Sequence, residues 1–370
     1  MDTSLFNNSL PKEITYTIYQ HLTETNDIRN CLLVCQLWNY LVTGLFGDRI
    51  QIKLSSNNCH AFLQDVKRYP SLGSKVWRIA FDNRTLSTMT VRRTETLVTL
   101  QSVINSCPNL VRFRLMSSDN LEAYLSVLQH VNTRMPSIQK ISIAYLSGVT
   151  PWIKQMHLYV NLKCCETIES MSILDVGKNE TLDKLGGLVA CTSKFPNLRQ
   201  CYLSGSIAST FNLDSMLEIN SNLEYLEICG GELTVKSDYR ARGVPKNDAI
   251  KSMELYVYSI DIKCLQYIME QLQGLESLTI KCTNDIIRDT STKPSEFRNI
   301  FERFILYCKQ LRNGHLINLK YNNFDLKLTQ PGIKLFTDED DESNLDSYFE
   351  DYNYYLSDDL DSWWYPGYTI

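Results

Sequence analysis

Cysteine and histidine are the side chains of this sequence best suited to nucleophilic catalysis or metal binding. The chain has 12 cysteines and 5 histidines, but no Cys-x-x-Cys pair. Cys31 and Cys35 lie four residues apart, Cys164 and Cys165 are adjacent, and no two histidines have the spacing of a ligand pair. We therefore expect reduced thiols in hydrophobic positions and no metal site.

Sequence signatures of catalysis are missing as well. The patterns Gly-x-x-x-x-Gly-Lys-Ser/Thr, Gly-x-Gly-x-x-Gly, His-Glu-x-x-His and Gly-x-Ser-x-Gly do not occur. Isolated residues such as Cys35 and His130 lie among apolar residues at helical spacing, as core residues do. The sequence therefore predicts no catalytic residue and no cofactor, and an enzyme with an unrecognised site is kept as a third alternative.

Composition and charge narrow the class of protein. The 370 residues are 44% hydrophobic and 21% charged, as in an ordinary globular chain. No stretch has the ~18 uncharged apolar residues of a transmembrane helix, and the N-terminus lacks a signal sequence. We expect no membrane association and an intracellular location, cytoplasmic or nuclear or both. Because glycosylation of asparagine requires secretion, we interpret the triplet Asn179-Glu180-Thr181 as a coincidental match to the glycosylation pattern. Residues 1–337 carry 37 basic and 31 acidic side chains, a net charge of +6 too small and dispersed to indicate nucleic-acid binding.

A repeated apolar pattern occupies the middle of the chain. The spacing apolar-x-x-apolar-x-apolar recurs, with 28, 30, 30, 25, 27 and 25 residues between the starts of successive copies. The copies are Leu110/Phe113/Leu115, Ile138/Ile141/Ile143, Ile168/Met171/Ile173, Leu198/Cys201/Leu203, Leu223/Leu226/Ile228, Ile250/Met253/Leu255 and Leu275/Leu278/Ile280, with weaker copies at Val76/Ile79/Phe81 and Leu316/Leu319/Tyr321. This period is typical of leucine-rich repeats, in which strand and helix units bury their apolar faces by stacking into a curved solenoid. The Asn or Cys usual at the ninth position is absent, so we expect an irregular solenoid.

Residues between the apolar anchors face away from the buried side of each strand. We predict that they line the concave face of the solenoid and bind a protein through aromatic anchors flanked by charges. The early copies are basic, whereas the later ones combine tyrosines with acids such as Glu224, Glu227 and Glu254. The candidate substrate-binding residues are Arg112, Arg114, Lys140, Arg199, Tyr202, Tyr225 and Tyr256. For each of them, the alternative is a solvated strand residue without a partner.

The first fifty residues have the pattern of two or three short amphipathic helices. Pro11 suits a first helical position, and Ile14, Ile18 and Leu22 recur four residues apart. The whole segment resembles the F-box motif in Leu10-Pro11-x-Glu13-Ile14, Ile18, His21-Leu22, Asp27-Ile28, Leu33-Val34-Cys35-x-x-Trp38-x-x-Leu41 and a trailing Ile50. Joint spacing over so many positions is far less frequent by chance than a lone short motif.

The resemblance implies partners. In F-box proteins three helices bind the Skp adaptor, which joins them to a cullin–RING ubiquitin ligase. The resemblance assigns to adaptor contact, or to the small core that supports it, Leu10, Pro11, Ile14, Ile18, Val34, Trp38 and Leu41. The alternative is an N-terminal helical cap packed on the following domain.

The end of the chain differs in composition from the rest. Residues 338–370 contain 11 acidic residues, nine aromatic residues and no Lys or Arg. Because acids interrupt every apolar run, this segment would not form a core alone. We expect either a disordered tail or a tail docked on the solenoid, where its acids would meet Arg112, Arg114 and Lys140.

The expected fold is an α/β solenoid with an N-terminal three-helix F-box (1–50), a linker (51–74), an irregular leucine-rich-repeat horseshoe (75–337) and an acidic, aromatic-rich tail (338–370). The resemblance implies a non-catalytic substrate-recognition subunit of an SCF (Skp–cullin–F-box) ubiquitin ligase. Such a subunit binds a protein substrate, of unknown identity here, for ubiquitin-dependent degradation. The alternative is a non-degradative repeat scaffold for protein interactions.

Overall fold

The computed structural model describes most of the chain between residues 50 and 336. The described residues are 50–54, 59–81, 90–116, 121–130, 135, 137–143, 149–174, 176, 179–236, 246–285, 294–321, 324–329 and 332–336. They form two compact units, one ending at Val149 and one beginning at Thr150. The F-box-like segment before Ile50 and the tail 338–370 lie outside the described residues.

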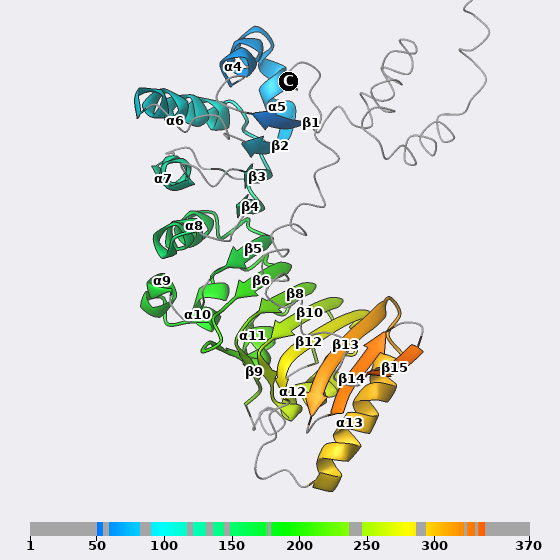
Figure 1. Cartoon of the computed structure of the whole chain (residues 1–370). Coiled ribbons are helices and arrows are strands. Elements are labelled where there is room, and N and C mark those ends of the chain that lie inside the picture. The colour runs from blue at the N-terminus through cyan, green and yellow to red at the C-terminus, as the bar shows by residue number, and fades with distance from the viewer. Residues whose placement is uncertain are drawn as a thin grey trace, which may run out of the picture. The chain divides into compact units, whose positions relative to one another are not determined.

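Four parallel strands form the sheet of the first unit, in the order β1-β2-β3-β4. They are β1 (Ile50–Leu54), β2 (Val76–Phe81), β3 (Arg112–Leu115) and β4 (Lys140–Ile143). The helices between them are α4 (Cys59–Arg68), α5 (Pro70–Lys75), α6 (Thr90–Asn105) and α7 (Leu121–His130). Helices α6 and α7 lie on the same side of these strands (Figure 1).

Residues 51–54 and 59–74 are part of the folded first unit, although the sequence analysis assigns 51–74 to a linker. They form most of β1, all of α4 and most of α5. Ile52 and Leu54 alternate with polar residues and are buried, as is Phe62 of α4. Because β1 and α4 bury apolar side chains in this way, they add one more strand and helix before the first repeated copy.

The second unit contains six parallel strands followed by two antiparallel ones. The parallel strands are β5 (Ser170–Ile173), β6 (Gln200–Ser204), β8 (Tyr225–Cys229), β10 (Ser252–Val257), β12 (Ser277–Asp285) and β13 (Gly314–Tyr321). The strands β14 (Phe324–Thr329) and β15 (Gly332–Phe336) end the sheet as an antiparallel meander. The helices are α8 (Pro151–Lys163), α9 (Glu180–Lys184), α10 (Leu188–Thr192), α11 (Leu213–Ile219), α12 (Ile262–Gln271) and α13 (Pro294–Cys308). This mostly parallel α/β arrangement is consistent with the expected solenoid-like fold.

A second, smaller sheet lies beside the main one in this unit. Its strands are β7 (Thr210–Asn212), β9 (Glu232–Thr234) and β11 (Ser259–Ile260), paired in parallel in the order β11-β9-β7. The sequence analysis does not predict these strands, because two or three residues are too short to display an alternating pattern.

The predicted apolar anchors occupy matching positions on neighbouring strands. In the first unit Ile79 pairs with Phe113 and Phe113 with Ile141. In the second unit one row is Met171-Cys201-Leu226-Met253-Leu278 and the next is Ile173-Leu203-Ile228-Leu255-Ile280. All these side chains are buried. The seven strong copies of the pattern therefore coincide with strands and with the core, as predicted.

The last, weak copy of the pattern is aligned differently. It predicts Leu319 and Tyr321 of β13 as the partners of Leu278 and Ile280. The structure instead pairs Ile280 with Ile317, four residues before Tyr321. Ile317 and Leu319 are both buried and two residues apart, so either can serve as an anchor. Because apolar residues alternate along β13, the sequence alone does not decide between these two registers.

Asparagines link neighbouring copies at two of the turns that lead from a helix into a strand. The side-chain amide of Asn109 donates to the Ser74 carbonyl at 2.7 Å, and that of Asn197 donates to the Glu166 carbonyl at 2.7 Å. Each asparagine precedes the first anchor of its copy. These two side chains therefore tie the backbones of neighbouring copies together at this turn.

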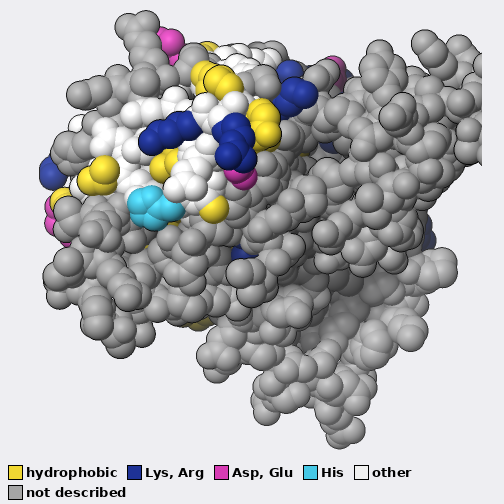
Figure 2. All heavy atoms as spheres, turned by 90° about the horizontal axis from the view of Figure 1, so that it is seen from above, with side chains coloured by type: hydrophobic (Ala, Val, Ile, Leu, Met, Phe, Trp, Pro, Cys, Tyr) yellow, Lys and Arg dark blue, Asp and Glu magenta, His cyan; other side chains and the backbone are white. Residues whose placement is uncertain are grey.

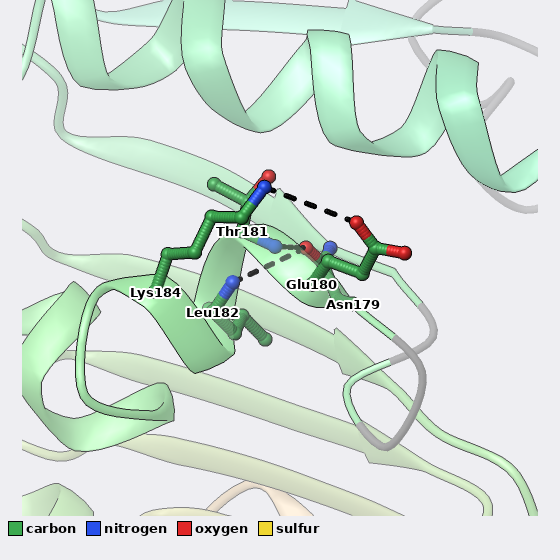
Figure 3. A network of polar contacts seen from close by, with 5 residues as sticks. All are labelled: Asn179, Glu180, Thr181, Leu182 and Lys184. Carbon is green, nitrogen blue, oxygen red and sulfur yellow. Dashed lines mark hydrogen bonds and ion pairs between the residues drawn. The ribbon is translucent and has the colours of Figure 1, made fainter.

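Helix α9 begins at a buried cap (Figure 3). The Asn179 side-chain oxygen accepts hydrogen bonds from the backbone N–H groups of Thr181 and Leu182 at 3.1 and 3.3 Å, and its amide nitrogen donates to the Leu174 carbonyl. Asn179 is 3% exposed. The side chain of Asn179 is therefore buried, with its oxygen capping the helix and its nitrogen bonded to the preceding loop.

Two glycines let the loop after β8 pass close to the loop after β6. Gly230 has φ +80° and Gly231 has φ +72°, a left-handed conformation that favours glycine. A Cβ atom on Gly230 would lie 2.1 Å from the Gly205 carbonyl oxygen. The close stacking of these two loops therefore depends on the missing side chain.

We expect Gly230→Ala to lower the free energy of unfolding by about 3 kcal/mol or more, because it combines left-handed strain with a backbone clash. Gly186→Ala is the matched control, since Gly186 has φ +87° but an added Cβ would only touch Ala190 at 3.4 Å. Chemical denaturation of both variants gives the two values. If both variants lost the same free energy of unfolding, the contact of the new Cβ atom with Gly205 would contribute nothing to the loss, which would contradict the prediction.

Candidate functional site

The outward side chains of the second unit form rows across the strands, in the same way as the anchors. One row is Tyr202-Glu227-Glu254-Thr279 on β6, β8, β10 and β12. The rows beside it are Gln200-Tyr225-Ser252-Ser277 and Ser204-Cys229-Tyr256-Lys281. The register therefore brings together three predicted residues, Tyr202, Tyr225 and Tyr256, with two glutamates that are absent from the predicted site.

Two tyrosines and two glutamates make a hydrogen-bonded cluster at the centre of these rows. The Tyr225 hydroxyl donates to Glu227 Oε2 at 2.7 Å, and the Tyr256 hydroxyl donates to Glu254 Oε2 at 2.9 Å. Tyr225 comes two residues before its glutamate and Tyr256 two residues after its own. The tyrosines thus lie at diagonal corners of the cluster. We call Tyr202, Tyr225, Glu227, Glu254 and Tyr256 the acidic-aromatic cluster.

Aromatic contacts extend the cluster on both sides. The rings of Tyr202 and Tyr225 are 5.3 Å apart with an interplanar angle of 44°. The Lys281 ammonium lies 5.4 Å from the centre of the Tyr256 ring, within the range of a cation–π contact. This face of the sheet therefore already holds one cation against a tyrosine.

The two carboxylates of the cluster oppose each other electrostatically. Glu227 and Glu254 are direct partners on adjacent strands, where like charges destabilise a sheet. Glu227 is 6% exposed. Burial raises the pKa of Glu227 to about 7; the hydrogen bond from Tyr225 lowers this pKa, and the Glu254 charge adds a smaller increase. Burial and the neighbouring carboxylates raise the pKa of Tyr225 and Tyr256, so both hydroxyls stay protonated and donate.

Arg199 lies at the rim of this face. Its guanidinium is 3.2 Å from Glu224 Oε1, and both side chains are about half exposed. An exposed pair of this kind contributes ~0–1 kcal/mol to stability. Arg199 is thus part of a surface ion pair at the start of β6 rather than of the acidic-aromatic cluster.

The basic residues predicted from the early copies lie on the first unit. Arg78, Arg112 and Lys140 are register partners on β2, β3 and β4, and Arg114 lies in the next row. Arg78 donates to the Gln51 side chain at 3.3 Å, and the Arg112 guanidinium lies 5.3 Å from the Trp77 ring centre. Arg78 and Arg114 are 6% and 7% exposed. Neighbouring cations raise the local positive potential and favour acidic partners.

Another basic surface lies on the first unit around α4 and α5. Helix α4 ends in Lys67 and Arg68, α5 ends in Lys75, and His60 of α4 is exposed. Seen from above the view of Figure 1, several Lys and Arg side chains gather beside a His on the described part of this face (Figure 2). The sequence analysis does not predict this surface, because it treats these residues as a linker.

The described residues that could perform nucleophilic or metal chemistry are mostly buried. Ten cysteines are described, all are free thiols, and nine are buried. Burial raises the pKa of Cys201 to about 12, which keeps this thiol protonated and poorly nucleophilic. Within the described ranges, no group of three His, Cys, Asp or Glu side chains is placed to hold a metal ion. In the same part of the chain, no helix combines the length and apolar character required to cross a membrane.

The remaining predicted site residues lie outside the described part of the chain. These are the adaptor-binding candidates Leu10, Pro11, Ile14, Ile18, Val34, Trp38 and Leu41. Comparison with known proteins adds no further assignment, since neither a protein-family model nor a curated protein matches this chain.

The sequence analysis placed Glu227 and Glu254 on the outward face but left them out of the candidate binding residues, although a signal was present. Glu227 precedes the anchor Ile228 and Glu254 precedes the anchor Leu255, so both hold the same position in successive copies. Aligning the copies would have placed the two carboxylates side by side. The burial of Glu227 and the hydrogen bonds from the tyrosines could not be predicted from the sequence and are seen only in the structure.

We expect Glu227→Gln to change how stability depends on pH. Folding raises the pKa of Glu227 from 4.5 to about 7, so the stabilising effect of its proton is present at low pH and is lost as the pH rises through 7. A glutamine is always neutral and still accepts the Tyr225 hydrogen bond. The variant should therefore be more stable than the wild type by about 2 kcal/mol at pH 8, with the difference shrinking toward pH 5.

Denaturation at several pH values between 5 and 8 measures this difference. Glu224→Gln is the control, because Glu224 lies three residues before Glu227 but is exposed. A stability difference for Glu227→Gln that stays constant over this range would contradict the prediction.

Proposed function

We propose that this chain is the substrate-recognition subunit of an SCF-type ubiquitin ligase. The segment 8–50 binds the Skp adaptor through its F-box-like helices, and the outward strand faces of an irregular leucine-rich-repeat domain bind a protein substrate. The observation that carries the proposal is the joint spacing of the F-box-like positions directly before a chain of repeated strand–helix units.

Several features of the described residues support a binding role for the repeats. Regular anchors hold the strands in register, so outward residues from distant parts of the sequence form continuous rows. In the second unit these rows contain Tyr202, Tyr225 and Tyr256, and tyrosine is enriched in protein interfaces. An open sheet face offers a surface for a macromolecule more readily than a closed pocket for a small substrate.

The mechanism of such a receptor is proximity. It holds the substrate near the ubiquitin carrier that the cullin–RING ligase recruits, which raises the effective concentration of substrate lysines around the carrier. No residue of this chain takes part in a covalent step. The alternative, a non-degradative scaffold, uses the same surfaces but leaves the lifetime of its partner unchanged.

Co-purification of the full chain with the Skp adaptor tests the proposal. We expect the wild type to bind and the triple variant Leu10→Ala, Pro11→Ala, Ile14→Ala to lose binding by more than about 100-fold, since interface anchors contribute ~2 kcal/mol or more each. The matched control is Lys12→Ala, Thr15→Ala, Thr17→Ala, which changes intervening positions outside the motif. A wild-type chain that fails to bind the adaptor would refute the proposal.

Partner lifetime separates the receptor from the scaffold. In cells, a protein captured by the repeats should have a longer half-life when the chain carries the Leu10, Pro11 and Ile14 substitutions. An unchanged half-life, with adaptor binding lost, would favour the scaffold. Thermal unfolding of the same variants shows whether the repeat domain is still folded.

A further inference from the structure

The outward side chains of the first unit form two rows across β1, β2, β3 and β4. One row is Gln51-Arg78-Arg112-Lys140 and the other is Lys53-Ala80-Arg114-Ser142. Five of these eight residues are basic and none is acidic. Lys53 belongs to this face because β1 is a strand and not part of a linker. We call Lys53, Arg78, Arg112, Arg114 and Lys140 the first-unit basic face.

Two contacts within the fold hold these cations in place without cancelling their charge. The Arg78 guanidinium donates to the Gln51 side chain at 3.3 Å, and the Arg112 guanidinium lies 5.3 Å from the centre of the Trp77 ring. Gln51 and Trp77 are both neutral. A net positive potential over the face therefore follows from its residue types and register, whatever further contacts each side chain makes.

The members of the face differ in how they can act on a partner. Arg78 and Arg114 are 6% and 7% exposed, so they act mainly through the potential that they add. Lys53, Arg112 and Lys140 are partly exposed and lie on three different strands. An acidic segment lying across the strands can therefore touch these three cations.

The tail 338–370 of this chain has the complementary composition. It contains 11 acidic residues, nine aromatic residues and no Lys or Arg, and the two kinds are interleaved, as in Tyr348-Phe349-Glu350-Asp351-Tyr352. Carboxylates pair with Lys and Arg, and aromatic rings pack against guanidinium groups, as the Trp77 ring does against Arg112. The tail thus fits both the charge of the face and its aromatic contact.

The second unit is a less favourable surface for the tail. Its outward rows place Glu227 and Glu254 side by side on β8 and β10, and these residues repel an acidic segment. The length of the tail does not confine it to the unit from which it extends. Its 33 residues span about 110 Å when extended, whereas a compact unit of this size is ~40 Å across.

We propose that the tail 338–370 binds within the same chain to the first-unit basic face. Its carboxylates pair with Lys53, Arg112 and Lys140, and its aromatic rings pack against these side chains. A tethered segment has a high effective concentration at its site, so the tail binds there in preference to a free acidic protein. An acidic partner of the first unit therefore has to displace the tail. The proposal is independent of adaptor binding and of the receptor function.

Limited digestion of the full chain with chymotrypsin tests the proposal. This protease cleaves after aromatic residues, so the tail offers nine sites, and mass spectrometry assigns the cuts. A docked segment is cut only in its open state. We expect the wild-type tail to be cut at least about tenfold more slowly than the tail of the variant Lys53→Gln, Arg112→Gln, Lys140→Gln.

A matched variant separates the first-unit basic face from general electrostatics. Lys67→Gln, Arg68→Gln, Lys75→Gln removes the same number of positive charges from the other basic surface of the first unit, on α4 and α5. Its tail should be cut within about twofold of the wild-type rate. Equal acceleration in the two variants, or a wild-type tail that is cut as fast as in the first variant, would overturn the proposal.

A variant of the tail itself keeps the test independent of the fold. Replacing the 11 acidic residues of 338–370 by Asn or Gln leaves both folded units unchanged and should release the tail, so that it is cut as fast as in the basic-face variant. High salt should have the same effect on the wild type, because it screens the charges. A neutral tail that is still cut slowly would show that charge does not hold it.

Dilution distinguishes binding within one chain from exchange between two copies. The wild-type cleavage rate should stay the same on about 100-fold dilution of the chain at a fixed protease concentration, since a tethered tail has a fixed effective concentration. A rate that rises on dilution would assign the tail to the face of a second copy and overturn the proposal. Cuts within residues 50–336 of each variant report whether the two units remain folded.

Discussion

Burial of two apolar side chains from each strand, at alternate positions, holds the strands of each unit in a common parallel register. Rows such as Met171-Cys201-Leu226-Met253-Leu278 are buried from end to end. Each such side chain contributes ~1.5–3 kcal/mol by leaving water. A slip of one residue would turn a whole row toward solvent, so this burial fixes the register strongly.

The register decides what the opposite face of the sheet presents. Side chains alternate along a strand, so every buried row implies an outward row one residue away. Glu227 and Glu254 are adjacent because the anchors Ile228 and Leu255 are adjacent. The unfavourable carboxylate pair is thus a consequence of core packing, which supplies the stability that the pair reduces.

The outward rows of the two units carry charges of opposite sign. The first unit carries the row Arg78-Arg112-Lys140, whereas the second carries the acidic-aromatic cluster. Each row collects side chains that lie some 25 to 35 residues apart in the sequence.

The sequence alone determined the strands, the anchors and their outward neighbours, because a repeated spacing of large apolar residues has few other physical explanations. It did not determine the elements β1, α4 and α5 in place of a linker, the short strands β7, β9 and β11, or the register of β13. These elements depend on strand pairings that are too short, or too ambiguous in register, to produce a periodic pattern in the sequence. The tertiary structure alone decided that Glu227 is buried and that Tyr225 donates a hydrogen bond to it, because burial and side-chain geometry depend on how the strands pack.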